Sequence, residues 1–169
     1  MKSLSFKHLA TLALTLALAA CASAPDAADP ALLQQLDLLM RRAEPRLMVQ
    51  MRLSTGVVNT GDPISAEVAS GADGYLYVFQ VGTDGRTLSM VFPNAMDGAN
   101  YIAAGSTIRL PRANWRMAAR GPAGVGHLVA VVSDKPLDLL ALQTSVGQGK
   151  LEVASPYGAA MATLRETAP

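Results

Sequence analysis

The sequence predicts a mainly β protein: an antiparallel β-sandwich, immunoglobulin-like or a related barrel, preceded by one N-terminal helix. Two observations carry this prediction. The spacing of apolar residues is helical over residues 31–44 and changes to alternation from Arg46 onward. About six to eight short apolar runs, separated by turn residues and without an internal repeat, then occupy residues 46–166. This pattern is typical of a sandwich or barrel.

The segment "ALLQQLDLLMRRAE" at residues 31–44 is the predicted helix. Asp29 stands at the N-cap position, Pro30 at the first helical position, and Pro45 follows the end. The apolar residues near one helical face are Leu32, Leu33, Leu36, Leu39 and Met40. We expect this face to pack on the domain. The alternative is a docking helix for a partner, or one that lies on the membrane surface.

Alternating apolar and polar residues predict the first strands. The run "RLMVQMRL" at residues 46–53 alternates in this way, and "PISAEVAS" at 63–70 repeats the pattern. The run "GYLYVFQV" at 74–81 is apolar on both faces, which predicts a central strand buried on both sides. "LSMVFP" at 88–93 follows, and Asp84-Gly85 between these two runs is a strong hairpin signal.

Later strands are predicted from three further apolar runs. They are "STIRLP" at residues 106–111, the region around "WRMAAR" at 115–120, and "VGHLVAVVS" at 125–133. The segment "GAAMATLRE" at 158–166 fits a short helix or a last strand. We favour the strand, because its larger apolar side chains are poorly spaced for a helical stripe.

Residues 1–20 have the layout of a secretory signal peptide: a basic start, an apolar run from Leu9 to Leu18, and small residues before Cys21. The apolar run is too short to span a bilayer of about 30 Å as a helix. The tetrapeptide "LAAC" that ends at Cys21 resembles the bacterial lipobox, which directs lipidation of the cysteine thiol and cleavage before it. The alternative is an ordinary signal peptide with an incidental cysteine.

The lipobox resemblance implies a lipoprotein with a palmitate-bearing lipid anchor on Cys21. Several acyl chains are needed, because one chain alone binds a membrane only marginally. Ala22 is not aspartate, and in the enteric sorting rule this favours the outer membrane. We therefore expect the domain to face the periplasm from the outer membrane, with the cell surface as the alternative. Residues 21–30 are small and polar and form a predicted flexible tether.

Charge and cysteine content exclude some classes of function. Removal of Lys2 and Lys7 with the signal leaves 12 of the 14 basic residues against 13 acidic ones, a net charge of −1. Such a chain offers little electrostatic attraction for nucleic acid, so we expect no nucleic-acid partner. With Cys21 lipidated, no disulfide can form. Stability must therefore come from a hydrophobic core.

Ordered elements in the middle of the chain resemble a known family. They are "GYLYVFQVGTDGRTLSMVFPN" (74–94), "YIAAGSTIRLPRANW" (101–115), "GPAGVGHLVAVVSDKPLDL" (121–139) and "SPYGAA" (155–160). Together they resemble the bacterial domain-of-unknown-function family 4384, over about residues 60–166. The family occurs in exported lipoproteins and beside peptidase-like or kinase-like domains. The resemblance implies an accessory or recognition module and brings no catalytic residues.

The chemical inventory favours no enzyme class. Gly-x-Ser-x-Gly is absent, and a lipidated cysteine cannot act as nucleophile. His127 is the one histidine after the signal peptide and no free cysteine remains, so we expect no metal site. The glycine-rich stretches at 121–126 and 147–150 lack Gly-Lys followed by Ser or Thr, so we expect no nucleotide and no cofactor. We interpret His127, inside an apolar run, as a structural or edge residue. The alternative is an envelope hydrolase with a site around His127, built on a serine and an aspartate distant in sequence.

A charge asymmetry is the most suggestive functional feature. No acidic residue lies between Asp97 and Asp134. The same stretch holds a predicted patch for an anionic partner, consisting of Arg109, Arg112, Trp115, Arg116 and Arg120. Arginine forks suit carboxylates and phosphates, and tryptophan with arginine is typical of interface anchors. The alternative is a set of solvated arginines, with the tryptophan covering the core.

These observations predict a lipid-anchored outer-membrane or periplasmic lipoprotein. Its domain would serve as a non-enzymatic binding or accessory module for another component of the cell envelope, such as a secretion or surface assembly. An envelope protein or a glycan is the expected partner, besides the membrane that holds the lipid on Cys21.

Overall fold

The computed structural model describes residues 30–112 and 114–168. The described residues exclude the predicted signal peptide, the lipidation site Cys21, the N-cap Asp29 and all of the predicted tether except Pro30, which begins helix α1. Helix α1 (Pro30–Arg42) is followed by two β-sheets and a second helix, α2 (Leu139–Gly147). The protein is therefore mainly β with an N-terminal helix, as predicted.

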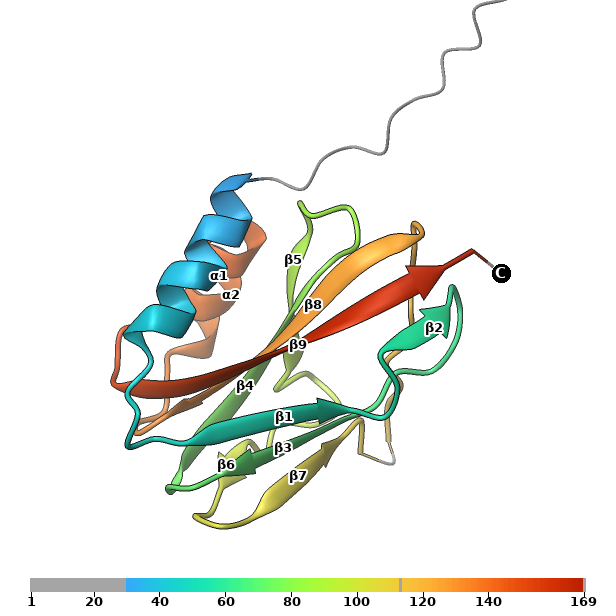
Figure 1. The fold of residues 1–169 in the computed structure, drawn as a ribbon. Coiled ribbons are helices and arrows are strands. Elements are labelled where there is room, and N and C mark those ends of the chain that lie inside the picture. The colour runs from blue at the N-terminus through green and yellow to red at the C-terminus, as the bar shows by residue number, and fades with distance from the viewer. Residues whose placement is uncertain (1–29, 113, 169) are drawn as a thin grey trace, which may run out of the picture.

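Two sheets form the body of the molecule (Figure 1). The small sheet has the strand order β1-β3-β7, and the large sheet has the order β2-β9-β8-β4-β5, with β6 paired to β4. The strands are β1 (Val49–Leu53), β2 (Val57–Asn59), β3 (Ala66–Ser70), β4 (Gly74–Val81), β5 (Leu88–Phe92), β6 (Tyr101–Ile102), β7 (Thr107–Leu110), β8 (Gly124–Ser133) and β9 (Tyr157–Thr167).

Two hydrophobic cores lie on opposite faces of the large sheet, and β4 contributes to both. Leu76 and Val78 belong to the core between the two sheets. Tyr77 and Phe79 belong to the core beneath the helices. Successive side chains of a strand point to opposite faces, so an uninterrupted apolar run is what a strand buried on both sides requires. The prediction of a central strand here is confirmed.

Helix α1 packs on the large sheet through one face, with Leu32, Leu36 and Leu39 buried beside α2 (Figure 1). The hydroxyl of Tyr157 donates to the carbonyl of Leu39 over 2.9 Å. The amide of Gln35 bridges to the backbone after α2, which ties the two helices together. Neither helix of the described residues is long and apolar enough to cross a membrane.

The Asp84-Gly85 hairpin is confirmed, as is the last strand at β9. Gly85 takes a positive φ of 64°. The Asp84 carboxylate accepts the backbone N–H groups of Arg86 and Thr87 over 3.0 and 2.9 Å. Burial raises the pKa of Asp84, but these bonds and the Thr87 hydroxyl outweigh it and hold that pKa below its ordinary value.

Three details differ from the sequence prediction. Residues 115–120 form no strand, and only an isolated bridge joins Ala118 to Pro63. Strand β2 runs parallel to β9, so the fold is not wholly antiparallel. Helix α2 was not predicted, because Leu139 and Leu140 are exposed and obscure its apolar stripe.

Candidate functional site

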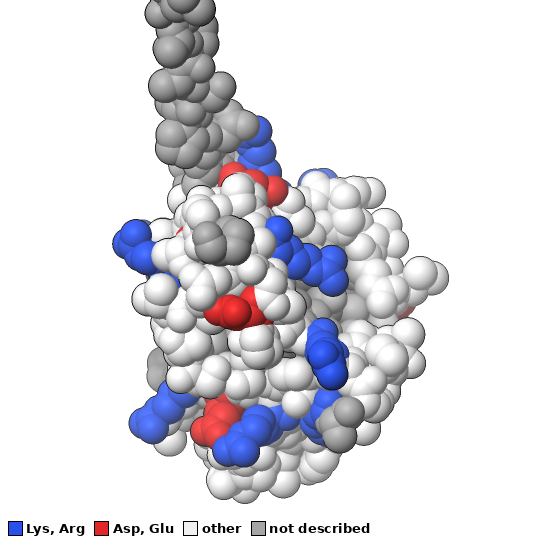
Figure 2. Space-filling view, turned by 90° about the vertical axis from the view of Figure 1, so that its right-hand side faces the viewer, with Lys and Arg blue, Asp and Glu red and all other residues white. Residues whose placement is uncertain are grey.

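The arginines of the predicted patch have different surroundings and form no single surface. Arg109 lies on β7 and pairs with Glu67, its register partner on β3. Both side chains are exposed on the outer face of the small sheet, away from its core. On the face shown in Figure 2, basic side chains occupy separate positions with acidic side chains beside some of them.

Arg112 and Trp115 both bind Asp97, and we call these three residues the Asp97 clip. The guanidinium donates from Nε to the carboxylate over 2.6 Å, and the indole Nε1 donates over 3.0 Å. Arg112 also donates to the carbonyl of Ala99 and lies 5.1 Å from the centre of the Phe92 ring. The clip therefore joins the loop after β5 to the segment after β7.

The hydrogen bonds of the clip shift the ionisation of its carboxyl group. The bond from Arg112 holds the pKa of Asp97 below its ordinary value of 3.8, against an opposing effect of burial, and the bond from Trp115 adds to the lowering. Asp97 is only 9% exposed, whereas the Arg112 side chain is 37% exposed. The charge on Arg112 is thus matched within the protein, which leaves it little capacity for an external anion.

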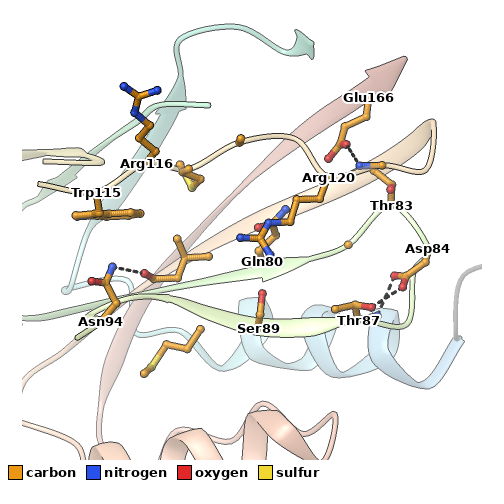
Figure 3. Close-up of a pocket in the computed structure, with 16 residues that line it drawn as sticks. Gln80, Thr83, Asp84, Thr87, Ser89, Asn94, Trp115, Arg116, Arg120 and Glu166 are labelled. Atoms are coloured by element: carbon orange, nitrogen blue, oxygen red, sulfur yellow. Dashed lines mark hydrogen bonds between the residues drawn. The ribbon is translucent and has the colours of Figure 1, made fainter. Parts of the chain in front are cut away.

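The remaining two arginines, Arg116 and Arg120, border a groove of 460 Å³ (Figure 3). We call it the Arg120 groove. Its floor is the β4–β5 hairpin, on the same sheet face as the core between the sheets, and its wall is the segment 115–121. The volume falls in the range of small-molecule sites, about 300–1,000 Å³.

The floor of the Arg120 groove carries polar side chains in strands that are otherwise apolar. Gln80 and Ser89 are register partners on β4 and β5, and both are half-buried. In the described part of the chain neither side chain has a hydrogen-bond partner within the protein. Half-buried groups of this kind are satisfied by water or by a ligand.

The wall supplies the positive charge. Neither Arg116 nor Arg120 makes an ion pair with any residue of the ranges 30–112 and 114–168. Figure 3 shows Arg120 reaching over the floor toward Gln80, while Arg116 extends from the rim away from the floor. Arg120 is therefore the cation placed to meet a group bound in the groove.

The wall is held in place by backbone bonds rather than by regular pairing. Three of them join it to the loop before β3: Ile64 N to Met117 O at 2.8 Å, Ala119 N to Asp62 O at 3.0 Å, and Gly61 N to Ala119 O at 3.0 Å. The buried carboxylate of Glu166 on β9 accepts the N–H of Gly121 over 2.6 Å. Arg120 thus projects from a fixed backbone.

The two ends of the Arg120 groove differ in charge. Asp84 and Glu166 lie at one end, and the indole of Trp115 lies at the other beside Asn94 (Figure 3). Both carboxylates already accept backbone N–H groups. The groove therefore runs from an acidic end, past neutral polar side chains and Arg120, to an aromatic end.

His127 lies on β8, between Val81 of β4 and Thr163 of β9. Its ring Nδ1 lies 3.2 Å from the hydroxyl of Thr163. Burial lowers the pKa of His127. Within the ranges 30–112 and 114–168, no carboxylate bonds to this ring, so the geometry assembles no serine-histidine-aspartate set around it.

No metal centre can be assigned to residues 30–112 and 114–168, where no three His, Cys, Asp or Glu side chains gather closely enough. Three residues of the Arg120 groove were not identified from the sequence: Gln80, Ser89 and Glu166. Gln80 interrupts an apolar run, a signal that could have marked it. Glu166 gave no signal, because its partner Gly121 is 45 residues away.

Comparison with solved structures finds two distant neighbours. The sulfur carrier protein SoxY from Chlorobium limicola f thiosulfatophilum is 14% identical, with a TM-score of 0.39, over 80% of this chain and 98% of that one. Spo0M, a sporulation control protein from Bacillus subtilis, is 10% identical, with a TM-score of 0.42, over 75% of this chain and 51% of that one.

Comparison with curated proteins finds no match. Comparison with protein-family models finds one match, which includes the β4–β5 hairpin and the wall of the Arg120 groove but not Glu166 of β9. Residues 57–136 match the family described as "Domain of unknown function (DUF4384)", which confirms over that range the resemblance predicted from the sequence.

Proposed function

We propose that this protein is a lipoprotein, anchored in the outer membrane through Cys21, whose β-sandwich domain is a non-enzymatic accessory module that binds another envelope component. The lipobox resemblance at Cys21 supports the anchor. A partner protein or glycan within a secretion or surface assembly fits the accessory role. The domain faces the periplasm in this proposal.

The observation that carries the binding role is the Arg120 groove. It combines an arginine without an ion-pair partner in the described residues with half-buried polar side chains that have no protein partner. Such convergent polar groups in a concave site are typical of ligand recognition. The surroundings of His127 support no hydrolytic role, so a binding module is the function we favour over a hydrolase.

The anchor is tested by palmitate labelling in a bacterial host. Wild type and Ser23→Ala should take up label and be cleaved before Cys21, because serine at this position has no part in lipidation. Cys21→Ala should take up no label and remain an uncleaved precursor. Labelling or cleavage that persists in Cys21→Ala would overturn the anchor.

The binding role is tested by photo-crosslinking in cells. A photoreactive residue at Thr87, exposed on the groove, should capture an envelope component. The matched control is Gln50, exposed on the outer face of the small sheet. Adducts at Thr87 but not at Gln50 are expected. Equal adducts at both positions, or none at either, would contradict recognition through this groove.

A further inference from the structure

We infer that the Arg120 groove binds a saccharide that carries one carboxylate, with Arg120 holding the carboxylate and Gln80 and Ser89 holding adjacent hydroxyls. This inference rests on the proposed function and names the class of ligand that the groove takes.

The charge distribution favours a ligand with a single anionic group. Arg120 lies over the floor and can form a planar, two-bond contact with a carboxylate. Asp84 and Glu166 occupy one end of the same groove, where a second anionic group would be repelled. A hydroxyl at that end would instead donate to a carboxylate oxygen. Polyanions such as acidic peptides are therefore disfavoured.

The floor favours a hydroxylated ligand. The Gln80 amide and the Ser89 hydroxyl each donate and accept, as do the hydroxyls of a saccharide. They lie opposite each other in the β4–β5 register and so can engage neighbouring hydroxyls on one sugar ring. The Trp115 ring at the far end adds an apolar surface of the kind that sugar ring faces contact. Each of these groups has a counterpart in an acidic saccharide.

Strand addition by a peptide at the edge of β5 is disfavoured. The carbonyl of Val91 already accepts the side-chain amide of Asn94 over 3.0 Å. The β4–β5 ladder is irregular between Val78 and Phe79, so the edge is bent there. An added strand needs a regular row of open N–H and C=O groups. The groove therefore recognises its ligand through side chains.

The inference is tested by calorimetry on the full-length protein in a detergent without sugar headgroups. Cellobiouronic acid, a disaccharide with one carboxylate, is the probe, and cellobiose is its neutral counterpart. We expect cellobiouronic acid to bind at least tenfold more tightly than cellobiose. Arg120→Gln should weaken its binding at least tenfold, and Ser89→Ala about threefold, because each removes one ligand contact.

The matched control is Arg52→Gln, which removes an exposed arginine from the outer face of the small sheet. It should leave binding unchanged, and all three variants should unfold as wild type does. Tighter binding of triglutamate, or of glycerol 1-phosphate as a lipid-headgroup probe, would overturn the saccharide class. Equal binding of cellobiose, no binding of cellobiouronic acid, or equal loss in Arg120→Gln and Arg52→Gln would also overturn the inference.

The outcome is separable from that of the proposed function. If photo-crosslinking at Thr87 captures an envelope component while cellobiouronic acid fails to bind, the binding module stands and the saccharide ligand falls. If cellobiouronic acid binds through Arg120 while no adduct forms at Thr87 in cells, the ligand class stands and the partner role falls.

Discussion

The Asp97 clip and the wall of the Arg120 groove belong to the same short stretch of chain, yet their arginines have opposite surroundings. The charge of Arg112 is matched by the buried carboxylate of Asp97, which also accepts the indole N–H of Trp115. Arg120 projects from a fixed backbone and has no ion-pair partner in the described residues. The difference shows that the positive charge of an arginine does not by itself tell whether the residue stabilises the fold or binds a ligand. What separates a structural arginine from a binding one is whether the fold provides its counter-charge.

The largest effect on stability is expected from Arg112→Gln. It should lower the free energy of unfolding by about 2 kcal/mol at pH 7, because it leaves the buried Asp97 carboxylate without its main partner. Arg116→Gln should change it by less than about 0.5 kcal/mol, since Arg116 is an exposed groove residue. Urea denaturation measures both. Equal losses in the two variants would erase the distinction.

Low pH should remove the difference in unfolding free energy between wild type and Arg112→Gln. The depressed pKa of Asp97 stabilises the fold above the ordinary value of 3.8, and this contribution is lost as pH falls through the folded-state value. In Arg112→Gln the largest part of this contribution is already missing, and only the bond from Trp115 still lowers the pKa of Asp97. The gap in unfolding free energy between wild type and Arg112→Gln should therefore close below about pH 4. A gap that stays constant from pH 7 to pH 3 would contradict the role of the ion pair.

A smaller effect is expected at the wall. Glu166→Ala removes the acceptor for the N–H of Gly121 and should cost about 1 kcal/mol of unfolding free energy. Glu166→Gln retains an acceptor oxygen and should cost less. Hydrogen exchange at the Gly121 amide, read by NMR, should accelerate in Glu166→Ala alone. Unchanged exchange there would mean that Glu166 does not hold the wall.

The smallest effect is expected at His127, whose register partner Val81 faces the helices, on the other side of the large sheet from the Arg120 groove. Burial lowers its pKa from 6.5, so the unfolded chain takes up the proton more readily than the folded one. Stability should therefore decline slightly as pH falls below about 6.5 through the folded-state value. His127→Gln should remove this decline, as thermal unfolding at pH 7 and pH 5 would show. If His127→Gln lost as much stability between pH 7 and pH 5 as wild type, titratable groups other than His127 would cause the decline.

The sequence-based expectations succeeded where a single local pattern decides the structure. The apolar run of β4 can be satisfied only by burial on two faces, and Asp84-Gly85 favours a tight turn by itself. The strand predicted at residues 115–120 did not form because tertiary contacts override the local pattern, and α2 was missed because its exposed leucines hide the apolar stripe. Residues 115–120 alternate like a strand but bond to a loop instead of to a sheet.

The candidate site was less predictable than the fold. The predicted patch grouped Arg109 with Arg120 on charge and spacing alone, whereas β7 directs Arg109 to the outer face of the small sheet. The counter-charges that separate these roles come from Glu67 and Asp97, which precede the arginines by more than ten residues. No spacing rule within one segment can locate such partners.

The position of β9 constrains when this domain can fold. The last strand is inserted between β2 and β8, and its first residue, Tyr157, also anchors α1 through its hydroxyl. Pairings that join both ends of the chain form late, because closing long loops has a high entropic cost. The large sheet is therefore incomplete until residue 167 is available. During synthesis the N-terminal part of the chain appears first, so the incomplete sheet needs protection from aggregation until β9 is available. Its most vulnerable surface is the edge of β8 that β9 later covers.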